Sequence, residues 1–369
     1  MYLMKRGNVP SQAHVGIPEG LHEEEHGRRG FAGPASHLYR RHPPTGWVRI
    51  DGPLRPRAFA CADLPTPDLR SADARPVEVL RSPDARVFLS RRSETMPYFV
   101  RNADGDEVQF IHAGRGRFET DYGVLHFEPG DYVVIPKGTT YRVIVETGPL
   151  MMLAIETPAP VALPDRGLLG HHAQFDRGVL TAPEPAPAAD DWREQREWEV
   201  HIKRDGGYTT VVYPFNPMDV VGWKGDLWVA KLNVRDFRPV MSPRYHLPPS
   251  VHATFQAGSL LVSTFVPRPL ESDPECQRVP FYHRNMDYDE VLFYHRGSFF
   301  SRAGIQPGML TLHPQGIHHG PQPQAVEASK GKTHTDEVAV MIESERPFSV
   351  LPDLETVERK EYALSWSTP

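Results

Sequence analysis

The sequence predicts an all-β protein built from two related β-barrels. Its 38 prolines and 29 glycines are spread between short apolar runs instead of being gathered in one tail. That distribution is typical of many strands joined by tight turns. The runs are bounded by Gly, Pro, Asp or Asn, and one segment of the first half recurs in the second half. Strand-rich composition and internal repetition together predict the architecture.

Residues 1–50 are polar and punctuated by glycine and proline. We expect an N-terminal arm lying on another surface, for which a neighbouring subunit is one candidate. A first barrel is expected over residues 51–180, followed by a linker at 181–191, where the chain is rich in proline and alanine. The second barrel is expected over residues 192–369. The one fair helix candidate is the charged stretch near Trp192 to Glu199.

Short β-runs define the strands of each barrel. In the first barrel they are Ala85–Leu89, Glu107–His112, Gly123–Phe127, Tyr132–Ile135 and Tyr141–Glu146. In the second they are Tyr208–Tyr213, Leu227–Leu232, Ala253–Phe265 and a dense set between Phe281 and Ile342.

The internal repeat aligns residues 97–114 with residues 280–297 without a gap. Both copies carry an Arg-Asn pair, two aspartates and a Glu-Val pair at matching positions, which chance similarity between turn-rich strands would not readily supply. Farther on, the Pro-Gly pair at 129–130 matches the pair at 307–308 in register. The chain therefore reads as two copies of one small jelly-roll barrel of the cupin-like type.

The two copies differ at three positions that could bind a metal. The second copy has His283, Glu290 and His319, and the first copy has Val100, Glu107 and Tyr141 in their place. Two histidines and a carboxylate form the facial triad that suits Fe(II) in oxygenases, because three coordination positions stay open for substrate and O₂. We therefore expect a metal site in the second barrel and a metal-free first barrel.

Alternatives to this ligand set are close by in the sequence. A single histidine on a strand more often serves packing than metal binding, so the prediction depends on all three residues together. His318 competes with His319, and Asp289 competes with Glu290. The same ligands could also hold Mn, Zn, Ni or Co, because affinity alone does not select iron.

Composition excludes several classes of protein. The 41 basic and 47 acidic residues give no strong field for nucleic acid or an anionic membrane. With only Cys61 and Cys276, a disulfide framework and a Cys-rich zinc site are not expected. The first residues include no apolar leader, and no stretch reaches membrane-spanning length. We expect a cytoplasmic protein without nucleic-acid or membrane partners.

Several motifs resemble homogentisate 1,2-dioxygenases, especially the shorter bacterial members, over most of the chain. The motifs are Gly30-Phe-Ala-Gly-Pro-Ala-Ser-His-Leu-Tyr39, Pro214-Phe-Asn-Pro-Met-Asp-Val-Val-Gly-Trp-Lys-Gly225, His246-Leu-Pro-Pro-Ser250, Tyr282-His-Arg-Asn285 and His319-Gly-Pro321. The resemblance implies Fe(II) on His283, Glu290 and His319, in agreement with the repeat. It also implies a catalytic histidine at His246 and a further active-site histidine at His313.

The resemblance implies ring cleavage of homogentisate by O₂ to maleylacetoacetate, as in tyrosine and phenylalanine breakdown, and a homo-oligomer such as a trimer or hexamer. Two departures matter. One more residue than in long-chain members separates the His-Arg-Asn motif from Glu290, and a family tyrosine falls on Phe299. Arg302 is a candidate partner for a substrate carboxylate. Alternatives are a dioxygenase for gentisate, hydroquinone or another phenol, a non-oxidative metal-dependent isomerase or hydrolase, and a non-catalytic binding barrel.

Overall fold

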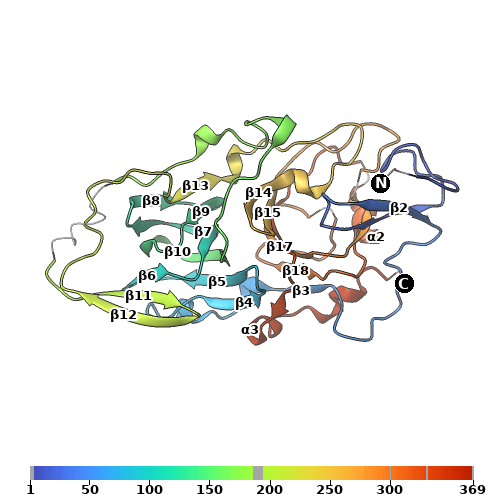
Figure 1. The fold of residues 1–369 in the computed structure, drawn as a ribbon. Helices are drawn as coiled ribbons and strands as arrows, with labels where there is room; N and C mark the ends of the chain where they lie inside the picture. Colours follow the sequence, from blue (N-terminus) through green and yellow to red (C-terminus); the bar gives the residue numbers. More distant parts are fainter. Residues whose placement is uncertain (1–3, 186–193, 279, 300, 330, 368–369) are drawn as a thin grey trace.

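The computed structural model describes residues 4–185, 194–278, 280–299, 301–329 and 331–367. Strands dominate these residues and confirm the all-β prediction (Figure 1). The strands of the first half are β1 (His22–Gly27), β2 (Ala35–Arg40), β3 (Arg57–Phe59), β4 (Val77–Arg81), β5 (Arg86–Arg92), β6 (Phe99–Asn102), β7 (Asp106–Thr120), β8 (Gly123–Phe127), β9 (Asp131–Ile135) and β10 (Thr140–Thr157). Those of the second half are β11 (Trp198–Arg204), β12 (Gly207–Tyr213), β13 (Ala230–Asn233), β14 (Ala253–Ala257), β15 (Leu260–Phe265), β16 (Tyr282–Asn285), β17 (Asp289–Arg296), β18 (Leu310–His313), β19 (Val338–Ser344) and β20 (Ser349–Val350).

The α-helices in the described part of the chain are short: α1 (Pro67–Arg70), α2 (Pro323–Ser329) and α3 (Pro352–Glu355). None of the described helices has the length and apolar character needed to cross a membrane. The helix expected near Trp192 to Glu199 is wrong for its described end, where β11 begins at Trp198. Trp198 is buried and packs against Phe99, so tertiary packing overrides the local charge pattern.

The first barrel is one sheet in the order β12-β11-β6-β10-β5-β4-β20, to which β7, β8, β9 and β13 are joined. Its long strands β7 and β10 are paired from Tyr141 opposite Thr120 to Thr157 opposite Asp106. The second barrel contains the sheet β14-β15-β19-β17-β18-β3 and a smaller sheet β16-β1-β2. The stretch Ala253–Phe265, expected as one strand, is the hairpin β14–β15, which turns at Gly258 with a positive φ of 60°.

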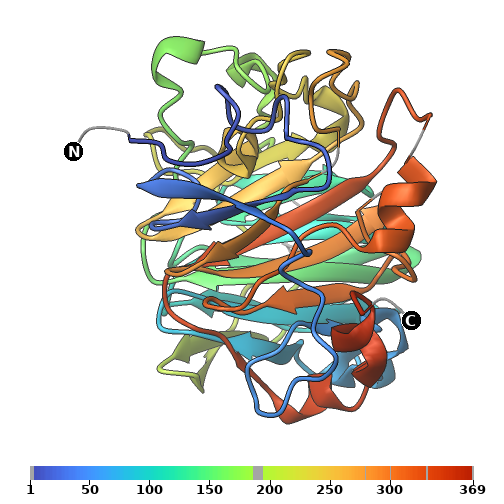
Figure 2. The ribbon, with the colours of Figure 1, turned by 90° about the vertical axis from the view of Figure 1, so that its right-hand side faces the viewer.

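Each barrel is completed by a hairpin from elsewhere in the chain. The hairpin β1–β2 runs along the second barrel, with β1 parallel to β16, and the hairpin β11–β12 runs along the first barrel, with β11 parallel to β6 (Figures 1 and 2). Because the repeat aligns β6 with β16, the two hairpins occupy equivalent places. The predicted arm therefore pairs with this chain's own second barrel.

The hydrogen-bonded sheets also cross the expected domain boundaries. β3 joins the second barrel by pairing with β18, and β13 and β20 join the first barrel by pairing with β9 and β4. Of the expected linker at 181–191, residues 186–191 lie outside the described part of the chain. Thr181 already pairs with Lys231 of β13, so the sheet holds the start of that segment.

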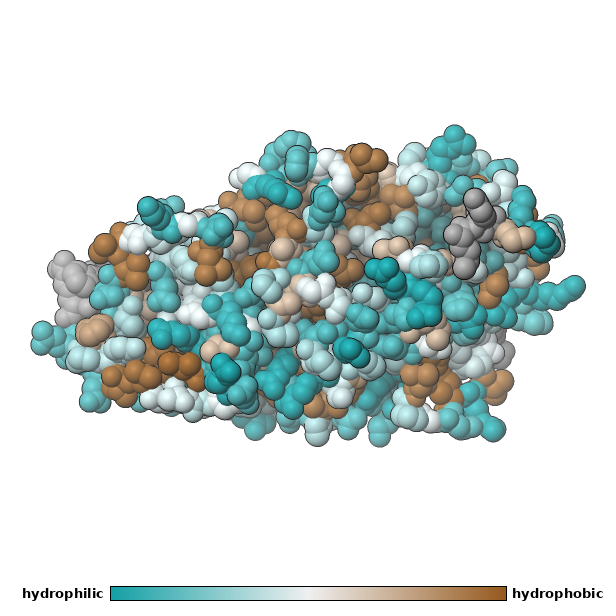
Figure 3. Space-filling view, in the orientation of Figure 1, coloured by the Kyte–Doolittle hydropathy of each residue, from teal (hydrophilic) through white to brown (hydrophobic). Residues whose placement is uncertain are grey.

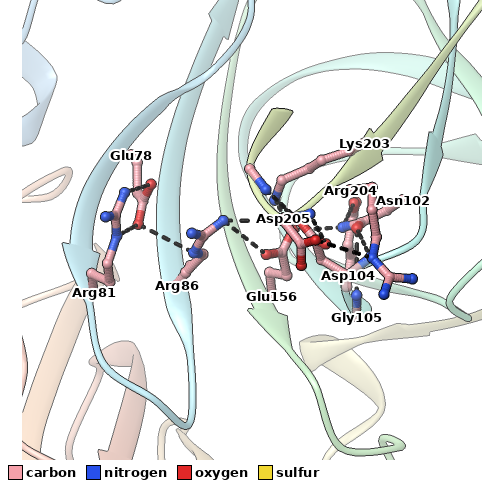
Figure 4. Close-up of polar contacts among 12 residues, drawn as sticks. Glu78, Arg81, Arg86, Asn102, Asp104, Gly105, Glu156, Lys203, Arg204 and Asp205 are labelled. Atoms are coloured by element: carbon pink, nitrogen blue, oxygen red, sulfur yellow. Dashed lines mark hydrogen bonds and ion pairs between the residues drawn. The ribbon is translucent and has the colours of Figure 1, made fainter. Parts of the chain in front are cut away.

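A polar network fastens the turn of the β11–β12 hairpin to the first barrel. The backbone N–H groups of Asp205 and Gly206 donate to the carboxylate of Asp104 at 2.6 and 3.1 Å. Lys203 makes an ion pair with Glu156, and Figure 4 shows these side chains converging between neighbouring strands. The pair is buried, so each charge is compensated by the other.

One hydrophobic core runs through both barrels. Phe110 and Tyr132 of the first barrel belong to the same buried cluster as Phe255 and Phe293 of the second. The face seen in Figure 3 is largely hydrophilic, with separate hydrophobic patches, as is usual for a folded surface. Burial of this shared core favours folding of the two barrels as one unit.

Candidate metal centre

The three predicted ligand residues come together in the second barrel. His283 lies on β16, Glu290 near the start of β17, and His319 in a short bridge after β18. The backbones of His283 and His319 exchange two hydrogen bonds, of 2.8 and 2.9 Å. The two imidazole rings therefore lie side by side, with centroids 4.0 Å apart.

The atoms of this group are spaced as ligands of one metal ion would be. Nε2 of His283 is 3.4 Å from Oε1 of Glu290, and Nε2 of His319 is 3.0 Å from Oε2. Ligand atoms bonded at about 2.1 Å on adjacent corners of an octahedron lie about 3 Å apart. All three side chains are buried. The group fits a cation in both spacing and donor type.

A second observation supports this fit. Nδ1 of His283 lies 3.1 Å from the carbonyl oxygen of Phe281, to which it donates, so in the neutral ring that binds a metal Nε2 carries the lone pair. That Nε2 is buried and has no hydrogen-bond partner among the described residues. A lone pair facing a carboxylate in a buried site is unfavourable unless a cation or proton lies between them. The histidines hold the pKa of Glu290 well below its ordinary value, although burial alone would raise it.

The rival ligands are committed elsewhere. The carboxylate of Asp289 accepts hydrogen bonds from the backbone N–H groups of Gln315, at 2.9 Å, and Phe348, at 2.7 Å. Nε2 of His318 lies 2.9 Å from Oε1 of Glu24. The geometry therefore groups Glu290 and His319 with His283, and it places Asp289 and His318 outside the cluster.

A cavity of about 80 Å³ opens beside the candidate ligands. Its wall includes His283 and Glu290, together with His246, Leu247, Pro249, His252, Phe265, Arg268, Pro280, Leu292, Tyr294, Ser301, Arg302, Glu337, Ala339 and Met341. About half of these side chains are apolar or aromatic, and the other half are polar or charged. Such a site suits a small aromatic molecule with polar substituents.

His246 is on the cavity wall, where the resemblance places a catalytic group. Its Nδ1 is 2.8 Å from Oε1 of Glu271, and both side chains are buried. With Nδ1–H donated to Glu271, Nε2 is left as the basic nitrogen. Burial lowers the pKa of His246, and the hydrogen bond to Glu271 opposes that effect. This pair has the form of a general base with an orienting carboxylate.

His313 lies behind the candidate ligands and does not line the cavity. Its ring stacks on that of His319, with centroids 4.5 Å apart, and its Nε2 is 3.0 Å from the hydroxyl of Tyr362. Glu290 and His313 are opposite each other on β17 and β18. In this position His313 can fix the orientation of His319.

Phe299 and Arg302 both contact other residues of the second barrel. Phe299 is buried against Tyr294, with ring centroids 4.6 Å apart. Arg302 donates from Nη1 to the carbonyl oxygens of Gly320, at 2.6 Å, and Ser301, at 3.0 Å. Its guanidinium also lies over the ring of Trp366. Arg302 therefore supports the loop that follows His319.

The first barrel has a different arrangement at the equivalent positions. Glu107 accepts hydrogen bonds of 2.7 Å from Tyr141, Asn102 and Gln109. Val100 offers no donor atom, and burial raises the pKa of Glu107. In this barrel hydrogen-bond donors thus surround the carboxyl group that corresponds to Glu290.

Sequence reasoning missed the residues that support the site from a distance. Glu271 is 25 positions from His246, and no motif links the two. A second group of possible ligands, His14, Glu23 and His37, also escaped notice because it lies in the predicted arm. His14 is hydrogen-bonded to Glu23 and stacks on Phe281, so this group ties the arm to the cavity region.

Comparisons with known proteins place the chain among similar proteins. A family model described as homogentisate 1,2-dioxygenase N-terminal matches residues 82–233. A protein of Saccharolobus solfataricus, provisionally described as a dioxygenase, is 32% identical over 388 positions that cover 100% of both chains. Homogentisate 1,2-dioxygenases of Bradyrhizobium diazoefficiens and Nitrobacter hamburgensis are 30% and 28% identical over 71% and 76% of this chain. The alignments cover 60% and 65% of those two relatives.

Among solved structures, the chain is similar to Ylba of E. coli, with a TM-score of 0.39 and 7% identity over 83% of this chain and 98% of that one. A cupin 2 conserved barrel protein of Leptotrichia buccalis has a TM-score of 0.35 and 9% identity over 77% and 94%. The assignment of the fold rests on the strands and their pairing.

The relatives define an enzyme of the dioxygenase class. Within that class, the chain belongs to the homogentisate 1,2-dioxygenase family. The resemblance drawn from the sequence motifs is confirmed by this membership.

Proposed function

We propose that the enzyme is a non-haem Fe(II) dioxygenase that opens the ring of a hydroquinone, with homogentisate as the first candidate and maleylacetoacetate as its product. The observation that carries this proposal is the buried group of His283, Glu290 and His319, in which the unpartnered Nε2 of His283 faces a carboxylate. Both atoms of O₂ enter the product, so the reaction needs no separate reductant.

His283, Glu290 and His319 would hold the ion on one face and leave the cavity side open. When bound, Fe(II) would supply the redox chemistry that lets O₂ react with an aromatic ring. The stacking of His313 on His319, and the bond from Arg302 to Gly320, would keep the ligand ring in place. This geometry favours an orienting role for His313 over contact with the substrate.

His246 would accept the proton of a substrate hydroxyl at its Nε2. The depressed pKa keeps the imidazole neutral at pH 7, and Glu271 stabilises the cation formed when the proton arrives. Loss of that proton makes the ring electron-rich, which is what its oxidation requires. The apolar part of the cavity wall would exclude water from the reacting ring.

A second candidate is the same reaction on another hydroquinone, such as gentisate or a phenol of secondary metabolism. Phe299 favours this alternative, because it brings no hydroxyl to a position where the family resemblance implies a tyrosine. A non-oxidative isomerase or hydrolase using Zn or Mn would have the same ligands and would consume no O₂. The predicted homo-oligomer, the cytoplasmic location and the domain limits stay predictions.

Oxygen uptake after anaerobic loading with Fe(II) tests the proposal, with homogentisate, gentisate and hydroquinone offered in parallel. We expect stoichiometric uptake and a ring-opened product with homogentisate. Uptake with another hydroquinone alone would change the substrate, whereas no uptake despite bound iron would contradict the oxidative reaction. His283→Ala or His319→Ala should abolish iron retention, and His246→Ala should retain iron while losing turnover. Loss of iron from the last variant would contradict its role as a base.

A further inference from the structure

The cavity wall contains a buried arginine, Arg268, with a terminal nitrogen that makes no hydrogen bond among the described residues. The side chain of Arg268 lines the cavity together with His246, and the residue is only 7% exposed. Its Nη1 is buried and has no hydrogen-bond partner among the described residues. A buried guanidinium N–H without a partner is unfavourable, since it has lost water and gained nothing in return. Its position on a cavity wall suggests that a ligand supplies the missing acceptor.

The backbone at Arg268 is held firmly. Its N–H donates to Oγ1 of Thr335 at 3.1 Å, and its carbonyl accepts from the N–H of Thr335 at 2.8 Å. Pro267 and Pro269 flank it and restrict the backbone on both sides. The guanidinium is therefore presented from a fixed base, which lowers the entropy lost when a ligand binds.

None of the carboxylates around the cavity, which are Glu271, Glu290 and Glu337, forms an ion pair with Arg268 among the described residues. Oε1 of Glu271 is committed to His246, and in the described part of the chain no carboxylate lies within 4.0 Å of the guanidinium of Arg268. Arg302, the candidate named from the sequence, instead donates to two backbone carbonyls. Both arginines on this wall have a buried nitrogen without a hydrogen-bond partner among the described residues, but in Arg302 it is the inner Nε, whereas in Arg268 it is the terminal Nη1.

We propose that Arg268 receives the carboxylate of the substrate side chain and thereby selects an acidic hydroquinone over an uncharged one. This assignment rests on the proposed function, because it concerns the same cavity. A guanidinium matches a carboxylate with two parallel hydrogen bonds, which fixes the orientation of the ring as well as its affinity. An uncharged analogue would leave the cation buried and unpaired, a strong basis for discrimination.

Binding can be tested separately from turnover. The affinities of homogentisate and 2-methylhydroquinone, which lacks only the carboxylate, are measured by calorimetry without oxygen on the Fe(II)-loaded protein. For Arg268→Met we expect the Kd of homogentisate to rise about 100-fold and that of 2-methylhydroquinone to change less than about threefold. Arg268→Lys, which keeps the charge but loses the fork, should lie between wild type and Arg268→Met. Arg49→Met, a change at an exposed arginine that pairs with Asp51, is the matched control.

Equal weakening of both ligands, unchanged binding of both, or no binding of homogentisate to the wild type would overturn the assignment. If Arg268→Met fails to fold, Arg268→Lys still tests the assignment, because this variant should lose affinity for homogentisate and not for 2-methylhydroquinone. Oxygen uptake separates the two proposals. Selective loss of homogentisate binding without uptake by the wild type contradicts the dioxygenase reaction and leaves Arg268 as a carboxylate receptor. Uptake with the same KM for homogentisate in wild type and Arg268→Met contradicts the role of Arg268 alone.

Discussion

At the scale of single residues, the basicity of His246 depends on two opposing effects. Burial lowers its pKa, while the hydrogen bond of 2.8 Å from Nδ1 to Glu271 raises it. The carboxylate also fixes which ring nitrogen carries the proton. Glu271 is therefore a positioning residue for the proposed base, and it need not touch the substrate.

Replacement of Glu271 by Gln tests this dependence. The amide has no negative charge to stabilise the imidazolium, so kcat should fall about 100-fold while iron content stays at the wild-type level. The base must be neutral to act, and loss of Glu271 lowers its pKa further. The ascending limb of the plot of kcat against pH should therefore move to lower pH. Glu271→Asp, which keeps the charge, should recover part of the rate. A limb that stays in place would contradict the coupling.

Whether a site residue can be predicted depends on whether a sequence pattern or the folding of a distant loop brings it to the site. His283, Glu290 and His319 could be predicted because the repeat supplies a second copy in which two of the three are replaced. Glu271 and Arg268 could not, because their contacts with the cavity arise from folding of loops and have no local pattern. Arg302 is on the cavity wall as expected, yet its bonds to backbone carbonyls depend on a loop conformation that spacing does not encode.

At the scale of elements, the hairpin β1–β2 is the part that sequence reasoning placed least well. Its first strand reads His22-Glu-Glu-Glu-His-Gly27, a polar run that predicts a solvated segment. In the structure Glu23, Glu24 and Glu25 are buried, because each carboxylate has a partner. Glu23 pairs with His14 and Glu25 with His37. Hydrophobic periodicity therefore cannot predict that charged residues are buried in pairs.

Glu24 connects this hairpin to the candidate metal centre. Its Oε1 lies 3.1 Å from Nε of Arg284 and 2.9 Å from Nε2 of His318, and these neighbours are adjacent to His283 and His319 in the sequence. Glu24→Ala leaves Arg284, and Arg40 that pairs with Oε2, without a counter-charge. It should lower the free energy of unfolding by roughly 3 kcal/mol.

The same variant should lose iron faster than the wild type does when dialysed against a chelator. Urea unfolding and metal analysis measure the two effects. Glu19→Ala, at an exposed glutamate of the same segment, is the matched control and should change neither. Wild-type stability in Glu24→Ala would show that the hairpin is held by its backbone pairing alone.

At the scale of the whole molecule, the repeat governs more than the barrel strands. The hairpins β1–β2 and β11–β12 lie at equivalent places in the two barrels. However, β1–β2 precedes the first barrel in the sequence and completes the second, whereas β11–β12 was expected in the second barrel and completes the first. The alignment of the two halves revealed the barrels and not this exchange, because it stops short of the hairpins. With one core and strands passing between the barrels, the molecule should unfold as a unit.

The two barrels meet at a pair of histidines that the repeat makes equivalent, His112 and His295. Their Nδ1 atoms are 3.0 Å apart, so one ring donates a hydrogen bond that the other accepts. Burial lowers the pKa of His112 to about 4 and that of His295 to about 3. An unfolded chain has histidine pKa values near 6.5, and so it takes up protons at a pH where the folded protein does not.

Stability should therefore be complete above pH of about 6.5, fall as the pH drops towards 4, and level off below 3. Each histidine contributes a slope of up to about 1.4 kcal/mol per pH unit in that interval. A variant with both His112→Gln and His295→Gln should show a flatter dependence of unfolding free energy on pH between 7 and 4, measured by urea titration. His171→Gln, at an exposed histidine, should keep the wild-type slope. An unchanged slope in the double variant would mean that acid acts on other buried histidines, such as His252, and not on the junction between the barrels.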